Sequence, residues 1–319
     1  MSVNCPVCQS ADNLKVEEYR DYVLYHCNGC DVVFSDPMKS EASFYENSMD
    51  YQLRDRLIMD PIKWDFRWDM LEFLKNPPRE RGSLLDIGCG TGYFVKRAQS
   101  LGYSAHGIET NSRSVESGRR FFGLETIHAT DLGGFIDKLP GSRFNVVSLF
   151  QVLEHLEDPG HLLEEAKQVM AEESVLVIAV PLRERWPDTS GTDGDYPPHH
   201  LTRWSLKSLE YILDKHGYRI RKHVTEGFPL ENMPTLIYNY ILKLAPFLTL
   251  KGKLKNSGNA HSHSKSEMPE LTDEEALGVL KKRKLKMNIA TVTGIPIWLV
   301  LKALGAKGPN IYLEAVLKP

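Results

Sequence analysis

The stretch Leu84-Leu-Asp-Ile-Gly-Cys-Gly-Thr-Gly-Tyr-Phe94 joins a short apolar segment to a turn with three alternate glycines, Gly88, Gly90 and Gly92. The apolar residues predict a buried strand, and the residues after the turn predict the start of a helix. Glycine permits positive φ angles and lets a ligand approach the backbone. A glycine turn between strand and helix therefore predicts a site for a nucleotide-like ligand beside the helix N-terminus.

The spacing of the glycines separates two classes of nucleotide site. A dinucleotide fingerprint, G-x-G-x-x-G, requires a third glycine at the position of Tyr93, whereas this chain has G-x-G-x-G preceded by Asp86. This pattern resembles motif I of class I S-adenosylmethionine-dependent methyltransferases. The resemblance implies that Asp86 and the glycine loop hold the methionine and ribose part of that cofactor. A plain tight turn is the alternative that the loop alone leaves open.

Strand and helix patterns alternate after the glycine loop, which predicts parallel βαβ units. The resemblance implies an α/β fold with a Rossmann-like, seven-stranded class I methyltransferase sheet whose last strand is antiparallel. It covers about residues 64–225 and the last ten residues. The strands after the glycine loop are predicted at residues 104–108, 125–129, 143–150, 174–180, 218–224 and 310–317.

Polar residues follow three of the predicted strands. Glu109 lies about twenty residues beyond the loop, where a carboxylate can accept both hydroxyls of a ribose. The resemblance places Asp131 near the adenine amino group, and a turn-forming role is its alternative. Gln151 opens the segment Gln151-Val-Leu-Glu-His-Leu-Glu-Asp-Pro159, which resembles a segment of many small-molecule methyltransferases. We expect Glu109, Asp131 and Gln151 to bind the cofactor.

Three histidines are candidates for catalysis. His199 and His200 lie in a long loop that ends Tyr196-Pro-Pro-His-His-Leu-Thr-Arg-Trp204, and His155 follows the preceding predicted strand. The loop resembles an element of methyltransferases that act on sugars, polysaccharide precursors and other secondary metabolites. Loops at the carboxyl ends of parallel strands meet in one crevice, and an imidazole can serve there as a general base. The alternative is that these side chains pack under the loop or are solvated.

Four of the five cysteines form two Cys-x2-Cys pairs separated by eighteen residues: Cys5, Cys8, Cys27 and Cys30. This spacing predicts a zinc ribbon in which the thiolates close a tetrahedron, and two disulfides or buried free thiols are the alternatives. A closed four-sulfur site has no open coordination position, so we expect structural Zn²⁺. Cys89, inside the glycine loop, is interpreted as a small buried residue and not a nucleophile.

Composition limits the compartment and the partners. The chain has 319 residues and a net charge of −3, which provides no basic footprint for nucleic acid. Its first ten residues are polar and contain two cysteines instead of a signal peptide, so we expect a cytoplasmic protein. We predict a zinc ribbon at 1–40, a methyltransferase domain at 41–225 and 309–319, and a mostly helical insertion at 226–308 with a flexible linker at 251–268.

Residues 287–301 contain no charged side chain and include Gly294 and Pro296. These fifteen residues are fewer than the roughly twenty that span a bilayer. A helix buried against the domain is one interpretation. Peripheral contact with a membrane or a lipid substrate, helped by the basic cluster at 281–286, is the other.

A ribbon followed by this core resembles sugar-nucleotide C-methyltransferases of antibiotic biosynthesis, but their additional large C-terminal domain is missing here. We therefore predict O-methylation of a small-molecule, sugar or saccharide/lipid-linked hydroxyl. A ribosomal-RNA base methyltransferase with a zinc module is the first alternative, although the acidic balance argues against it. The second alternative is a non-catalytic S-adenosylmethionine-binding scaffold whose ribbon recruits a partner.

Overall fold

The computed structural model describes residues 3–40, 67–186, 195–237 and 291–319. The chain divides into two compact units. The first comprises residues 1–185, 190–226 and 308–319, and the second comprises residues 186–189 and 227–307. The predicted linker at 251–268 and the basic cluster at 281–286 lie outside the described residues.

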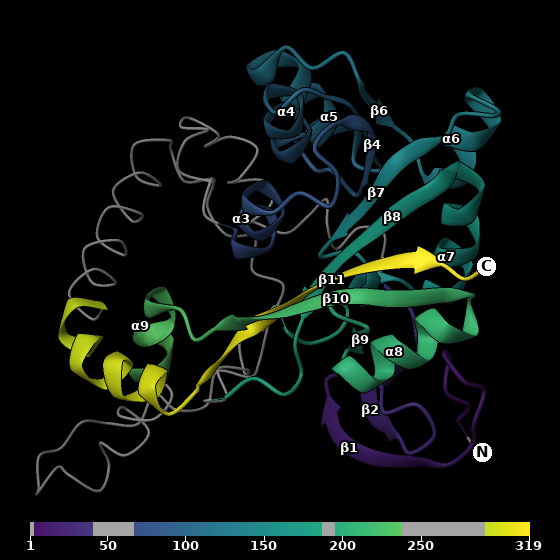
Figure 1. Ribbon diagram of the computed structural model, residues 1–319. Helices are drawn as coiled ribbons and strands as arrows, with labels where there is room; N and C mark the ends of the chain where they lie inside the picture. The colour runs from purple at the N-terminus through teal and green to yellow at the C-terminus, as the bar shows by residue number, and fades with distance from the viewer. Residues whose placement is uncertain (1–2, 41–66, 187–194, 238–290) are drawn as a thin grey trace, which may run out of the picture. The chain divides into compact units, whose positions relative to one another are not determined.

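The first unit is built on a seven-stranded sheet with the order β10-β11-β8-β7-β4-β5-β6 (Figure 1). The pairs β4–β5, β4–β7, β5–β6 and β7–β8 are parallel, and β11 runs antiparallel to β8. The predicted sheet, with its antiparallel last strand, is therefore confirmed. Its strands are β4 (Gly82–Ile87), β5 (Tyr103–Glu109), β6 (Ile127–Ala129), β7 (Phe144–Phe150), β8 (Met170–Pro181), β10 (Tyr218–Gly227) and β11 (Lys307–Leu317).

Each face of this sheet buries its own apolar core. Adjacent residues on one strand point to opposite faces, so Leu84 joins one core and Leu85 the other. Helices α3 (Trp68–Lys75), α4 (Tyr93–Ser100) and α5 (Ser112–Phe122) cover the Leu84 face (Figure 1). Helices α6 (Leu132–Lys138), α7 (Pro159–Val169) and α8 (Leu206–Lys215) cover the Leu85 face.

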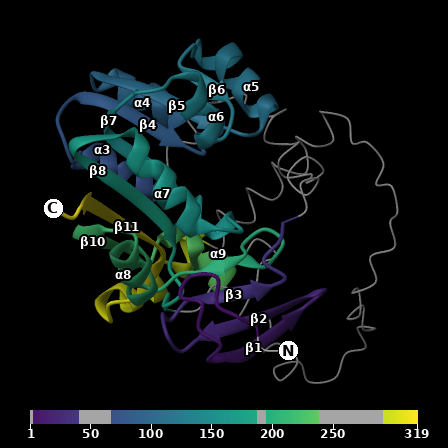
Figure 2. The ribbon, with the colours of Figure 1, turned by 90° about the vertical axis from the view of Figure 1, so that its right-hand side faces the viewer.

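A second sheet of four strands has the order β1-β2-β3-β9. Figure 2 shows its first three strands, β1, β2 and β3, side by side. The cysteine segment supplies β1 (Asn13–Tyr19), β2 (Tyr22–Cys27) and β3 (Val33–Asp36), whereas β9 (Thr202–Arg203) comes from the histidine loop. Val33 pairs with Arg203 and Phe34 with Thr202, in antiparallel register. The apolar side chains of the cysteine segment join the same core as α7 and α8. The ribbon thus packs against the α7 and α8 side of the seven-stranded sheet, within the first unit. The histidine loop adds the fourth strand, β9, to the ribbon's sheet.

The strand β8 begins four residues earlier than the sequence predicts, at Met170 instead of Ser174. Met170 pairs with Phe144 at the start of β7, and the register shifts between Phe144 and Val146. Val146 pairs with Val175, so the segment between Met170 and Val175 forms a bulge, and Glu173 within it has a positive φ of 54°.

The second unit has a small apolar core of its own. Phe228, Met233, Leu236 and Ala306 are buried, with Trp298 packed against them. Its described elements include η4 (Leu230–Asn232), α9 (Met233–Leu236) and a helix over residues 291–303. Within the described ranges, every helix is too short or too polar to cross a bilayer.

Candidate functional site

The glycine loop follows β4 and adopts left-handed backbone angles. The φ angles of Gly88, Gly90 and Gly92 are 73°, 55° and 75°. A Cβ at Gly88 would lie 2.7 Å from Val152, and one at Gly92 would lie 2.7 Å from Leu124, so packing excludes side chains at both positions. Among the described residues, nothing lies within 4 Å of a Cβ built at Gly90. The described part of the chain therefore leaves room for a ligand against this glycine.

Glu109, the last residue of β5, is fixed against this loop. Its Oε2 accepts a hydrogen bond from the Gly90 amide at 3.0 Å, and its Oε1 accepts one from the Asn111 amide at 2.9 Å. Oε1 also accepts from the Thr110 hydroxyl at 3.3 Å, whereas Oε2 keeps a second lone pair that can accept a further donor such as a ribose hydroxyl. The structure thus brings Glu109 to the glycine loop.

Asp86 lies inside β4 and is only 2% exposed. Burial raises the pKa of Asp86 to about 7, against the hydrogen bond that Ser148 donates at 2.7 Å. The Asp69 and Glu109 charges raise this pKa further, whereas Arg67 lowers it. A carboxyl in this position gains from any ligand that brings a positive charge.

Asp131 and Gln151 occupy two different settings. The Asp131 side chain caps α6 by accepting from the Gly134 amide at 2.8 Å. Gln151 follows β7 with a φ of 58°, and its Nε2 lies 3.4 Å from both Asp69 Oδ2 and Asn310 Oδ1. The proposed contacts of Asp131 and Gln151 with the cofactor stay predictions.

The sequence reasoning did not single out Asp69, which is 2% exposed on α3. It forms an ion pair with Arg67 and lies next to Gln151. On the far side of Gln151, Asn310 donates to Glu226 at 2.7 Å. A polar row thus runs along the carboxyl ends of the strands. No sequence signal separates Asp69 from the other charged residues of α3, Glu72 and Lys75.

The three candidate histidines meet in one cluster. The ring centroids are 4.7 Å apart for His155 and His199, 4.9 Å for His155 and His200, and 4.6 Å for His199 and His200. His155 ends η2 (Leu153–His155), just after β7. Burial lowers the pKa of His155 to about 4 and that of His200 to about 2, so both imidazoles are neutral at pH 7.

The tautomer of His155 follows from one hydrogen bond. Its Nδ1 lies 2.7 Å from the backbone oxygen of His199, and a carbonyl only accepts. Nδ1 therefore carries the proton, and the lone pair of the neutral ring is at Nε2.

A buried carboxylate that the sequence reasoning did not assign lies beside this cluster. Glu154 is 1% exposed, and burial raises its pKa to about 8. Within the described residues, neither carboxylate oxygen of Glu154 has a hydrogen-bond partner. Its Oε1 lies 3.8 Å from His155 Nε2. Its adjacency to His155 is visible in the sequence, but its burial is not.

The ribbon holds the histidine loop on both sides of His199 and His200. Before them, Tyr196 stacks on Tyr19 at 4.3 Å and donates to Glu17 at 2.9 Å, both on β1. After them, the Ser35 amide of β3 donates to the Leu201 carbonyl at 2.9 Å. The Leu201 amide in turn donates to the Glu154 carbonyl at 2.8 Å, which joins the loop to η2.

The four predicted zinc ligands converge in the ribbon. The Sγ atoms are 3.6 Å apart for Cys5 and Cys30 and 3.4 Å for Cys8 and Cys27, and all four lie within 4.8 Å of one another. A disulfide would need about 2.05 Å, whereas four thiolates at about 2.3 Å from a tetrahedral zinc ion are separated by about 3.8 Å. The sulfur positions fit a zinc ion better than two disulfides.

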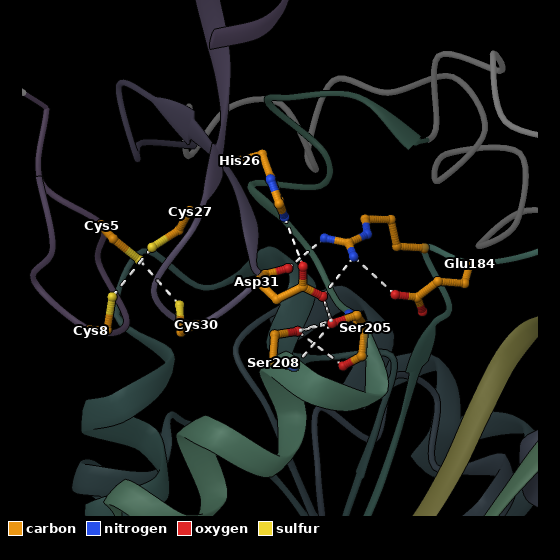
Figure 3. Close-up of polar contacts among 10 residues, drawn as sticks. Cys5, Cys8, His26, Cys27, Cys30, Asp31, Glu184, Ser205 and Ser208 are labelled. Atoms are coloured by element: carbon orange, nitrogen blue, oxygen red, sulfur yellow. Dashed lines mark hydrogen bonds and ion pairs between the residues drawn. The ribbon is translucent and has the colours of Figure 1, made fainter. Parts of the chain in front are cut away.

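Asp31, directly after Cys30, connects the ribbon to the sheet (Figure 3). Its carboxylate accepts from Arg183 at 2.7 Å and from Ser205, the N-cap of α8, at 2.5 Å. His26 lies 2.8 Å from the other oxygen. Burial alone would raise the pKa of Asp31, but the bonds from Ser205, His26 and Arg183 outweigh it and hold this pKa at about 2.

Taken with the strand order, the glycine loop and its paired glutamate define the class I methyltransferase fold. Residues 54–223 match the family model described as "Methyltransferase domain". Because this match covers more than half of the chain, the chain belongs to the methyltransferase domain family.

Several characterised proteins are similar to parts of this chain. Ubiquinone biosynthesis O-methyltransferase of Rhodopseudomonas palustris (strain TIE-1) is 23% identical over 150 residues, which are 45% of this chain and 59% of that enzyme. The mitochondrial ubiquinone biosynthesis O-methyltransferase of Schizosaccharomyces pombe is 29% identical over 106 residues, 29% of this chain and 37% of that one. The chain thus spans less than two thirds of the length of these relatives.

Among solved structures, a SAM dependent methyltransferase from Archaeoglobus fulgidus is similar to this chain. The alignment covers 85% of this chain and all of that chain, with 17% identity and a TM-score of 0.46.

Proposed function

We propose that this protein is an S-adenosylmethionine-dependent methyltransferase that methylates a hydroxyl of a small-molecule, sugar or saccharide/lipid-linked acceptor. The observation that carries the proposal is the hydrogen bond from the Gly90 amide to Glu109, at a glycine that no described residue covers. This hydrogen bond lies at the carboxyl ends of β4 and β5, where doubly wound folds bind nucleotides.

The residues of the glycine loop fit the proposed cofactor. Glu109 would accept a ribose hydroxyl, and Asp86 would offset the positive charge of the methionine part. Gly88, Gly90, Gly92, Asp131 and Gln151 complete the predicted cofactor contacts. When bound, the cofactor supplies a methyl group that is already activated for transfer. The protein then needs mainly to align the acceptor and exclude water.

The histidine cluster is the proposed acceptor side of the site. The lone pair of His155 is at Nε2, next to His199 and His200, so this cluster can take the proton of an acceptor hydroxyl. The two ubiquinone O-methyltransferases that resemble this chain support transfer to oxygen on a small molecule.

We propose a structural zinc ion in the ribbon. The sulfur geometry supports it, and so does Gly29, where a Cβ would press on Cys8 Sγ at 3.3 Å. Backbone hydrogen bonds from Cys8 and Val7 lower the pKa of Cys5 and so favour its thiolate form, which is the form that binds metal. Since all four ligands come from the protein, this ion would shape the fold and not the chemistry.

Peripheral membrane contact through residues 287–301 stays a proposal. In the described part of this range, five apolar side chains are exposed: Val292, Ile295, Ile297, Leu299 and Val300. These exposed apolar side chains support the proposal that the acceptor is presented at a lipid surface.

The proposal is tested by incubating the protein with methyl-labelled cofactor and a cell extract, followed by mass spectrometry of metabolites, lipids and RNA. We expect label in a metabolite or lipid fraction with formation of S-adenosylhomocysteine. Label confined to RNA would favour the ribosomal-RNA reading. Cofactor binding without any S-adenosylhomocysteine would favour the scaffold.

A further inference from the structure

The three histidines of the cluster are close enough to share an ion. One ring nitrogen from each of His155, His199 and His200 lies within 4.8 Å of the others. The rings are inclined to one another by 78°, 60° and 52°, so they converge by their edges and do not stack. Two imidazoles bound at about 2.1 Å to a tetrahedral ion have nitrogens about 3.4 Å apart. Small side-chain rotations therefore suffice to complete the geometry.

The orientation of His155 is that of a metal ligand. Its Nδ1 donates to the His199 carbonyl at 2.7 Å, which leaves Nε2 as the coordinating atom. Histidine ligands in metalloproteins are usually fixed by such a bond from the second ring nitrogen. Asp195 Oδ1 lies 3.8 Å from His200 Nδ1, which is near but beyond hydrogen-bond distance.

Glu154 is the second, independent observation. Its carboxylate is 1% exposed and accepts no hydrogen bond from the described residues. A buried carboxylate without such bonds is costly unless a cation compensates for it. Its Oε1 is 3.8 Å from His155 Nε2, close to the separation of two ligands on one ion. A cation held by His155 would lie within reach of this oxygen.

We propose that His155, His199 and His200 bind a divalent transition-metal ion of the zinc type, with Glu154 beside it as the charge-compensating carboxylate. Imidazole and carboxylate suit this class of ion. The site is distinct from the four-cysteine ribbon, whose ligands are all sulfur.

The inference also concerns how the acceptor binds, and this second part rests on the proposed function. Three protein ligands and one exchangeable position characterise metal sites that bind a substrate oxygen. The side chains of His155 and His200 are 21% and 11% exposed, so the cluster lies just below the surface of the described part of the chain. In this arrangement the acceptor hydroxyl would bind the ion, and the histidines would activate the hydroxyl through the ion that they hold, in place of taking its proton directly.

The test is a cobalt titration of the full-length protein whose ribbon has been loaded with one equivalent of zinc. Cobalt bound by nitrogen and oxygen gives visible ligand-field bands, whereas cobalt bound by cysteines adds strong thiolate charge-transfer bands. We expect one cobalt ion per chain with ligand-field bands alone. His155→Ala and His200→Ala should each weaken cobalt binding roughly a hundredfold, and Glu154→Gln roughly tenfold.

His161→Ala is the matched control, because its side chain is 67% exposed on α7. It should bind cobalt as the unchanged protein does. Retained ribbon zinc and an unchanged melting temperature would show that the cluster variants are folded. If a variant fails to fold, His155→Gln and His200→Gln replace it.

Absence of a non-thiolate cobalt site in the unchanged protein would overturn the inference, and so would equal binding by the folded cluster variants. Neither acceptor nor cofactor enters this titration, so its result is independent of the proposed function. A cobalt site in a protein without methyl transfer would leave the inference standing and refute the function. Methyl transfer without a cobalt site would refute the inference and leave the proposed function standing.

Discussion

The glycine loop at residues 88–92 is held by the neighbouring strand β5. The histidine loop at residues 195–205 is held by the N-terminal ribbon, which is far from it in the sequence. Gly90 and Glu109 are nineteen positions apart, but Tyr196 and Glu17 are 179 apart. The proposed cofactor side of the site is therefore built from local βαβ contacts. The proposed acceptor side depends on a separate sheet, and we expect the two sides to respond separately to substitution.

His155→Ala should show the largest difference between the two sides, measured as lost turnover against unchanged cofactor affinity. We expect turnover to fall about a hundredfold or more, because the acceptor hydroxyl loses its activating group. Cofactor affinity, measured by calorimetry, should not change. Turnover is followed as S-adenosylhomocysteine release with the labelled acceptor fraction, and the exposed His161→Ala serves as the control. A parallel loss of cofactor binding would contradict the claim that the two sides respond separately to substitution.

Glu109→Gln should affect the opposite side. The amide keeps the shape of the carboxylate but loses its charge and one acceptor oxygen, so cofactor binding should weaken by about 10–100-fold. Calorimetry measures this effect, and Glu116→Gln on the exposed side of α5 is the matched control. The ribbon should keep its zinc in both variants. Unchanged affinity in Glu109→Gln would remove Glu109 from the cofactor site.

Asp86 should make cofactor affinity depend on pH. Its pKa is raised to about 7, so the free protein keeps this carboxyl protonated below that pH. The ionised form attracts the positively charged cofactor, and affinity should rise about tenfold from pH 6 to pH 8. Without cofactor, the folded protein holds a proton that the unfolded chain releases near pH 4, so stability should fall as pH rises from about 4 to 7. Asp86→Asn should abolish both trends, and their persistence would assign them to another group.

Asp31→Asn should give the smallest effect and should be confined to the ribbon side. Loss of the charged bonds to Arg183 and Ser205 should lower the unfolding free energy by about 1–2 kcal/mol. Thermal melting measures the loss, with the exposed Asp21→Asn as the control in the same ribbon. Cofactor affinity should be unchanged. A weaker cofactor complex in Asp31→Asn would mean that the two sides are coupled.

The same contrast explains what the sequence could predict. The sheet was predictable because its strands are continuous apolar runs, and the proximity of Glu109 to the glycine loop follows from βαβ geometry. The pairing of β9 with β3 was not predictable, since a two-residue strand has no periodicity. The burial of Glu154 and Asp69 was also missed, because burial of a polar residue depends on tertiary neighbours that no local pattern encodes.

Hydrogen–deuterium exchange of the unchanged protein and of Cys8→Ser, each without ligands, tests the separate construction of the two sides most directly. Cys8→Ser removes one predicted zinc ligand, and a ribbon of this size needs its metal to fold. We predict that residues 195–205 lose their protection while residues 82–92 keep it. Equal protection of residues 195–205 in both proteins, or loss of protection in both segments, would contradict the account.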